Sequence, residues 1–176
     1  MRLAHERQPL LSTRRLFAIG ALAGAAGTAA MDLVLYLRYR RDGGQDSLWQ
    51  WESAGAVTTW DAASAPGQLG QKLERLVIGK KPPDTWARAT TNLVHWATGI
   101  GWGLQFAVLA SRTSSHPLLP ALGLGPSAWL ASYVILPLAK VYKPIWQYDA
   151  PTLGDDLSAH LVFGTTTSAV FAALTR

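Results

Sequence analysis

Cysteine is absent from this sequence of 176 residues, and charged residues are scarce. Without cysteine there is no disulfide framework, no thiolate nucleophile and no cysteine-ligated metal or iron–sulfur site. Charged residues make up 15% of the chain and hydrophobic residues 49%, whereas a soluble domain carries about 25% charged residues. The charges crowd into residues 1–15, 38–88 and 140–156 and leave four apolar stretches nearly free of them. This distribution indicates a bilayer, rather than water, as the solvent of the chain.

Catalytic signatures are also missing from the sequence. It contains no Gly-x-Ser-x-Gly nucleophile elbow, no phosphate-binding loop and no His-x3-His or His-Glu-x2-His pair. Gly99-x-Gly101-x-Gly103 lies inside an apolar stretch and lacks the strand and the third-glycine spacing of a dinucleotide fingerprint, so it indicates helix packing. We therefore expect a protein that is not an enzyme and that uses no cofactor and no metal.

The four apolar stretches are long enough to cross a bilayer as helices. They predict an all-α membrane protein, with residues 1–176 forming a single membrane domain of two helical hairpins. Lys and Arg do not decide the orientation. Most of those on the more basic side lie in one long loop, where the positive-inside rule weakens. The predicted spans cover about residues 16–37, 89–111, 118–141 and 157–174.

The first loop, residues 38–88, contains an amphipathic segment. Leu69, Leu73, Leu76 and Val77 recur at helical spacing and share one face, and two lysines and two prolines follow at residues 80–83. One interpretation is a helix that lies in the plane of the lipid headgroups. The other is a helix that packs back onto the ends of the protein's own spans, and the pattern does not decide between them.

Two of the predicted spans share a motif, which suggests an internal repeat. His95-x3-Gly99-x6-Phe106-Ala107-x-Leu109 matches His160-x3-Gly164-x6-Phe171-Ala172-x-Leu174 with an offset of 65 residues. A true repeat would make the two hairpins pseudo-equivalent about an axis along the membrane normal. Chance similarity in alanine- and leucine-rich sequence is the alternative.

Polar side chains inside the predicted spans form the first group of candidate site residues. Ionisable groups are costly there and call for a functional hypothesis. Alternating helix directions place these residues at similar depth on one side of the membrane, where they could bind a metal, relay a proton or contact a lipid headgroup. The simpler interpretation is hydrogen bonding between helices, with Asp155 and Asp156 capping the last helix. This polar layer comprises Asp32, Asn92, His95, Asp156 and His160.

Two further groups have structural roles. Small residues let helices approach closely in lipid, so five glycines are predicted packing positions, and a partner subunit could use the same surfaces. Basic and aromatic residues after the third span are typical of interfacial anchoring. The packing residues are Gly20, Gly24, Gly27, Gly99 and Gly164, and the anchor comprises Lys140, Lys143, Trp146 and Tyr148.

The second half of the chain resembles the YagU-like bacterial inner-membrane family. The resemblance rests on Lys143-Pro144-Ile145-Trp146-Gln147-Tyr148, Asp155-Asp156 and His160-Leu161-Val162-Phe163-Gly164, with Trp60-Asp61, Ala65-Pro66 and His95 in the first half. It implies a small multi-pass protein of the bacterial inner membrane and supplies no catalytic residues.

The expected function is that of an accessory or scaffolding subunit in a larger membrane assembly, such as a lipid-transport complex. Its expected partners are membrane lipids and other membrane subunits. The net charge of +5 does not indicate nucleic acid, because the basic residues flank apolar stretches where anionic headgroups lie. The alternatives are a small self-contained transporter or channel that uses the Asp/His layer and, less favoured, a metal-dependent membrane enzyme.

Overall fold

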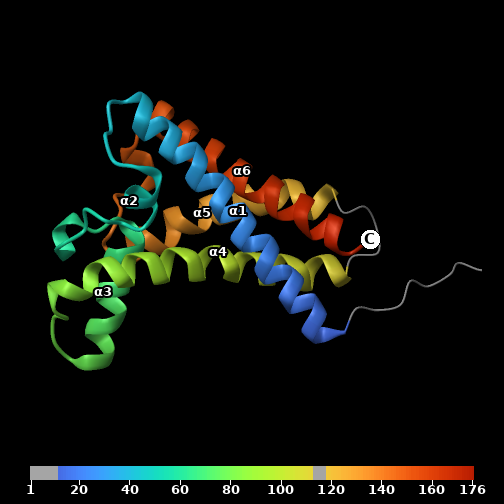
Figure 1. Cartoon of the computed structure of the whole chain (residues 1–176), viewed down its shortest axis with the longest axis horizontal. Coiled ribbons are helices and arrows are strands. Elements are labelled where there is room, and N and C mark those ends of the chain that lie inside the picture. The colour runs from blue at the N-terminus through green and yellow to red at the C-terminus, as the bar shows by residue number, and fades with distance from the viewer. Residues whose placement is uncertain (1–11, 113–117) are drawn as a thin grey trace, which may run out of the picture.

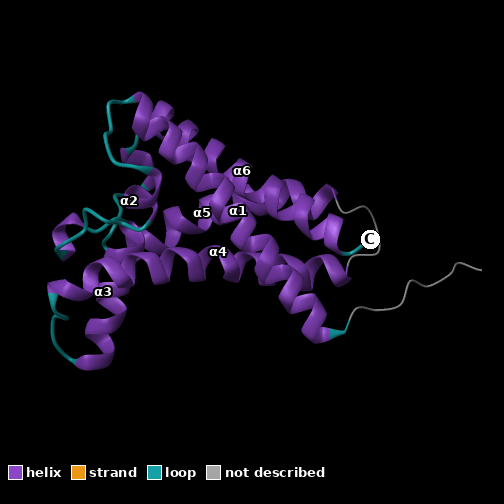
Figure 2. Ribbon diagram, viewed as in Figure 1, coloured by secondary structure: helices purple, strands orange, loops and turns teal. Residues whose placement is uncertain are grey.

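A computed structural model of the chain describes residues 12–112 and 118–176 and, in that part, contains helices and loops but no strand (Figure 2). The predicted all-α class is therefore confirmed for the described residues. The four long helices are α1 (Thr13–Arg41), α4 (Ala87–Arg112), α5 (Leu118–Leu138) and α6 (Ala150–Leu174). The short elements are α2 (Leu48–Glu52), η1 (Trp60–Ala62), α3 (Ala65–Ile78), η2 (Asp84–Trp86) and η3 (Ile145–Gln147).

Helix α1 lies at the centre of the bundle and packs along both α4 and α6, while α5 packs on α6 (Figure 1). Helices α1, α4 and α6 are each long and apolar enough to cross a membrane. The part of α5 over Gly123–Leu138 is apolar but shorter than these three. The first residues of α1 and the last residues of α6 lie at the same end of the bundle (Figure 1).

The last helix begins seven residues earlier than predicted, because Asp149 caps it. The Asp149 side chain accepts a hydrogen bond of 2.8 Å from the backbone N–H of Thr152, and a proline occupies the first turn. Asp155 and Asp156 therefore lie within the helix, and their predicted role as its cap is wrong. Helix α5 ends three residues before the predicted boundary, and Lys140 follows it with a left-handed φ of 54°.

Glycines set the closest contacts between the long helices. A Cβ atom on Gly24 would lie 2.6 Å from the carbonyl oxygen of Gly99, so α1 and α4 touch at the backbone there. Gly20 likewise faces α4, whereas Gly27 faces Phe163 and Thr167 of α6. The predicted packing surfaces are thus occupied inside the chain. The expectation that a partner subunit would use the ridge at Gly24 is wrong, because α4 already covers it.

The amphipathic helix α3 packs on the start of α4 through small residues. Gly67 faces the side chain of Thr91, and Gly70 faces Thr90. The side chain of Trp60, the first residue of η1, is buried. Its Nε1 donates a hydrogen bond of 2.9 Å to the carbonyl oxygen of Pro82, just before η2. The side chains of Leu73, Leu76 and Val77 nevertheless remain exposed. One face of α3 therefore packs on the protein, and another apolar face is left for the surroundings.

Candidate functional site

A cavity of about 350 Å³ lies between α1, α3, α4, α5 and α6. It exists because α1 and α4 cross at their glycines and spread apart toward the end that carries α2 and α3 (Figure 1). Helices α4 and α5 contact each other far less than α5 contacts α6. The volume of the cavity falls in the range of ligand-binding cavities. The walls are mainly apolar and include Met31, Leu35, Leu69, Trp102, Ile135 and Phe163.

The first polar group in this region is a pair formed by His95 and Asp32. Nε2 of His95 lies 2.8 Å from Oδ2 of Asp32 and 3.0 Å from Oδ1. Thr28 of α1 packs against Gly99 of α4. Asp32 and His95 each lie one helical turn away from this contact, so the close approach of the two helices brings their side chains together. His95 lines the cavity, whereas Asp32 is buried behind it with 3% of its surface exposed.

Glu52, at the end of α2, joins this pair, although no motif in the sequence predicts it. The Glu52 side chain lies against Asp32 and Trp96, and its Oε1 is buried without a hydrogen-bond partner among the described residues. Burial raises the pKa of the Glu52 carboxyl, and the nearby charge of Asp32 raises it further. Glu52 lies in a long loop without any local signal, so only the tertiary fold could reveal its position.

Asn92 does not line the cavity. Its side-chain amide donates hydrogen bonds of 2.9 Å to the carbonyl oxygens of Ser53 and Arg88. Arg88 donates to the carbonyl oxygen and to Oγ of Ser53, at 3.0 and 2.9 Å. Asn92 and Arg88 therefore fasten the residue after Glu52 to α4, which makes Asn92 a positioning residue for the loop.

The second polar group of the cavity is formed by His160 and Asp156 on α6. Nδ1 of His160 lies 2.9 Å from the backbone carbonyl oxygen of Asp156 and 3.4 Å from its Oδ1. A carbonyl oxygen only accepts, so Nδ1 must donate and carry a proton. Both residues line the cavity. The structure thus brings His95, His160 and Asp156 to one cavity, with Asp32 behind His95.

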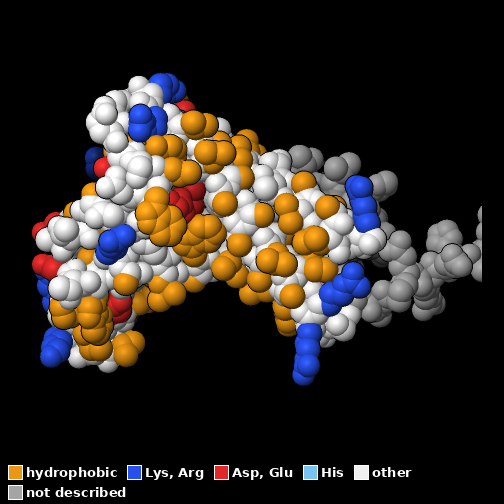
Figure 3. All heavy atoms as spheres, viewed as in Figure 1, with side chains coloured by type: hydrophobic (Ala, Val, Ile, Leu, Met, Phe, Trp, Pro, Cys, Tyr) orange, Lys and Arg blue, Asp and Glu red, His pale blue; other side chains and the backbone are white. Residues whose placement is uncertain are grey.

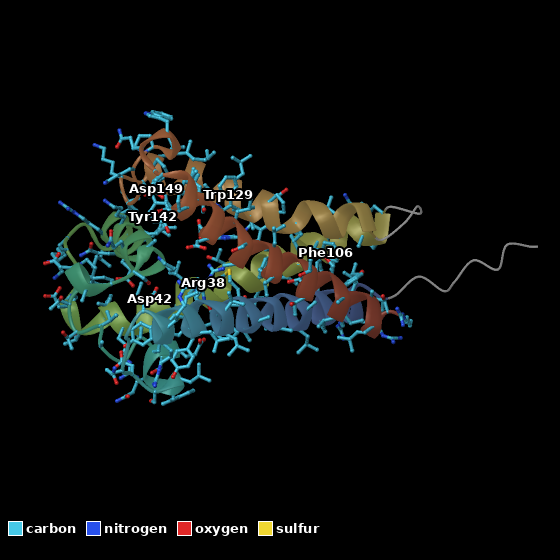
Figure 4. The ribbon with its side chains drawn as sticks, turned by 90° about the horizontal axis from the view of Figure 1, so that it is seen from above. Arg38, Asp42, Phe106, Trp129, Tyr142 and Asp149 are labelled. Carbon is cyan, nitrogen blue, oxygen red and sulfur yellow. The ribbon has the colours of Figure 1, made fainter. Side chains whose placement is uncertain are left out.

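Three tyrosines form a cluster at the end of α5, beside the cavity. The ring of Tyr133 lies 5.7 Å from that of Tyr142 and 5.4 Å from that of Tyr148. Tyr142 lines the cavity, and burial together with the charge of Asp156 raises its pKa, which keeps the hydroxyl protonated. Figure 4 shows Tyr142 near the end of the bundle that carries Asp149, with Phe106 in the opposite half.

The four residues of the predicted anchor divide between surface and interior. Lys140, Lys143 and Trp146 are exposed, and 80% of the Trp146 surface is accessible. Tyr148 instead turns toward Tyr133, and its hydroxyl oxygen accepts a hydrogen bond of 3.3 Å from the backbone N–H of Lys143. The residue type of Tyr148 alone could not distinguish a tyrosine at the membrane interface from one packed inside the protein.

Metal binding finds no support in the described part of the chain, where no group of three or more His, Asp or Glu side chains is arranged to hold an ion. Comparisons with known protein families, with curated proteins and with solved structures find no match to this chain. The resemblance to the YagU-like family therefore stays an expectation.

Proposed function

We propose that this chain is a non-enzymatic membrane subunit that holds a lipid in its cavity, as an accessory component of a larger lipid-handling assembly of the bacterial inner membrane. The observation that carries the proposal is the lining of the cavity, which is mainly apolar and contains a few polar side chains. Leu35, Trp102 and Ile135 are among the apolar residues, whereas His95, Asp156 and His160 are among the polar ones. An amphipathic molecule matches both kinds of side chain, because its tail and its head need different surroundings.

The surface of the bundle supports the proposed placement in a membrane. Apolar side chains cover the middle of the face in Figure 3, and Lys and Arg side chains lie at both ends. We propose that α5 is a fourth crossing beside the three longer helices, since its 21 residues carry no charged side chain. Leu76 and Val77 of α3 are 81% and 86% exposed, beside Lys72 and Arg75, which suits a helix in contact with anionic headgroups.

Two contacts support the proposed tandem hairpins. Gly99 of α4 packs against Thr28 of α1, and Gly164 of α6 packs against Gly125 of α5. Gly99 and Gly164 occupy the same place in the sequence motif, and each lies four residues after a histidine that lines the cavity. In this arrangement both hairpins contribute one histidine to a shared site.

A self-contained proton-coupled transporter is the second candidate. The observation that favours it is the buried group of Asp32, His95 and Glu52, since chains of ionisable side chains carry protons in membrane transporters. Proton flux into vesicles that contain the purified protein alone would support this alternative. An accessory subunit instead gives no flux alone and is recovered with other membrane proteins by a native pull-down.

Lipid binding can be tested by purification in a mild detergent followed by native mass spectrometry. We expect one lipid to remain bound to the unmodified protein. Ala131→Phe should displace it, because Ala131 lines the cavity and a phenyl ring would fill that space. Leu130→Phe is the matched control, since Leu130 is 53% exposed and absent from the cavity wall. Equal lipid retention by the two variants, or no lipid on the unmodified protein, would contradict the proposal.

A further inference from the structure

We infer that the bound molecule is a neutral lipid alcohol of the diacylglycerol class, whose hydroxyl group lies between the two histidines. This inference rests on the proposed lipid-binding function and specifies the head of the ligand. It follows from the charge and the hydrogen-bonding capacity of the polar side chains that line the cavity.

Charge excludes an anionic head. No Lys or Arg among the described residues lines the cavity. Three carboxyl groups, those of Asp32, Glu52 and Asp156, accompany only two imidazoles, so even with both imidazoles protonated and Glu52 neutral the group has no net positive charge. The guanidinium of Arg38, on α1, donates to the carbonyl oxygen of Asp155 and to Oγ of Ser158, at 2.7 Å each, and does not line the cavity. A phosphate or carboxylate would therefore enter a low-dielectric site without a matching cation.

Hydrogen bonding requires a head that can both donate and accept. Asp156 lines the cavity, and its carboxylate, which accepts from the Tyr133 hydroxyl, can accept a further hydrogen bond from a ligand that donates. Each histidine uses one ring nitrogen for an aspartate contact, Nε2 in His95 and Nδ1 in His160, and the other nitrogen has no hydrogen bond to any described residue. That second nitrogen accepts when the ring is neutral and donates when it is protonated. A hydroxyl group suits both states, and the Tyr142 hydroxyl adds a further partner.

The apolar walls accommodate the start of the acyl chains. The cavity is too small for a whole two-chain lipid, so most of each chain would extend into the bilayer. The head would be held by directional hydrogen bonds, and the tails would remain in the surrounding bilayer. Head recognition by few polar groups in an apolar site is the usual pattern of ligand specificity.

Three lipids with the same acyl chains provide the test on the unmodified protein. Dioleoylglycerol has the free hydroxyl, its 3-O-acetyl ester has no donor, and dioleoylphosphatidic acid is anionic. Native mass spectrometry of the protein with each lipid should give at least about tenfold weaker binding for the ester and for the acid, the loss expected for one hydrogen bond to a charged group. Equal or stronger binding of either would overturn the inference and leave the proposed lipid binding intact.

A pair of variants tests the proposed role of Asp156 directly. Asp156→Asn should weaken dioleoylglycerol binding by about tenfold while leaving the ester unaffected. Asp155→Asn is the matched control, because Asp155 neighbours it in sequence, is exposed and does not line the cavity. Equal effects of the two substitutions would overturn the assignment of Asp156. If a co-purified lipid is lost in Ala131→Phe but dioleoylglycerol never competes with it, the head assignment fails and the cavity function stands.

Discussion

At the scale of single residues, the most costly feature is the group of carboxyl groups around His95. Asp32 is almost fully buried, and its Oδ2 lies 2.8 Å from Nε2 of the His95 ring. Glu52 lies beside the same carboxylate, so two acids compete for one imidazole. Buried carboxylates without partners cost several kcal/mol, which makes the stability of this region sensitive to pH.

We predict that Glu52→Gln stabilises the protein at neutral pH. Burial raises the pKa of Glu52 above its ordinary value of 4.5 in the folded state, so the folded protein holds a proton more tightly than the unfolded chain. Stability from this group is therefore complete below about pH 4.5 and decreases as the pH rises through the folded pKa. Thermal unfolding in detergent between pH 4 and pH 8 should show a gap in Tm that opens with pH. Asp61→Asn, an exposed carboxyl in the same loop, should show none.

A second prediction concerns the Asp32 and His95 pair. His95→Leu should lower the free energy of unfolding by about 3–5 kcal/mol, because it leaves the Asp32 carboxylate buried without its partner. Replacing both residues by leucine should cost much less than the single change, since no unpaired charge remains. Unfolding by sodium dodecyl sulfate in mixed micelles measures both values. Additive effects of the two substitutions would show that the pair is not coupled.

At the scale of helices, glycine decides which surfaces meet. Gly99 and Gly103 of α4 lie against Gly24 of α1, so two backbones are in contact within a single chain. Lipid supplies no hydrophobic force between helices, and van der Waals packing at such contacts holds the bundle together. The exposed face of α3, with Leu73, Leu76 and Val77, is therefore a better surface for contact with membrane or partner than either glycine ridge.

Gly24→Leu should destabilise the bundle itself. A side chain at this position would meet the carbonyl oxygen of Gly99 and the backbone of Gly103, and forcing α1 away from α4 costs at least about 1–3 kcal/mol. Gly101→Leu is the control on α4, because nothing lies within 4 Å of a Cβ atom at that position. Both changes suit lipid, so both proteins should insert. A loss of thermal stability confined to Gly24→Leu would support this arrangement, and equal stability would contradict it.

At the scale of the whole molecule, the number of crossings decides where the two tails lie. With α5 as a fourth crossing, both tails are on one side of the membrane, and with three crossings they are on opposite sides. The native chain has no cysteine, so Gln8→Cys and Thr175→Cys can be labelled singly with a reagent that does not cross the membrane. We predict that both label from the same face. Labelling from opposite faces would mean that α5 does not cross the bilayer.

Local sequence patterns were sufficient to predict a membrane environment and the approximate positions of the long helices. Apolar runs with few charges are a local property, so α1, α4 and α6 could be recognised without a structure. The meeting of Asp32 and His95 could also be predicted, because the constant rise of a helix places them at matching positions along antiparallel helices. Boundaries were less certain, since capping by Asp149 depends on one hydrogen bond that competes with other starting points.

The tertiary structure alone decided which side chains meet. Periodicity places Asn92 and His95 on one helix face, but the loop after α2 takes the amide of Asn92 away from the cavity. The same loop brings Glu52 to Asp32 across twenty residues of sequence. Contacts of this kind depend on the register between helices and on the path of a long loop. Local spacing encodes neither the helix register nor the loop path, because the register and the loop path both follow from where the glycines let α1 and α4 cross.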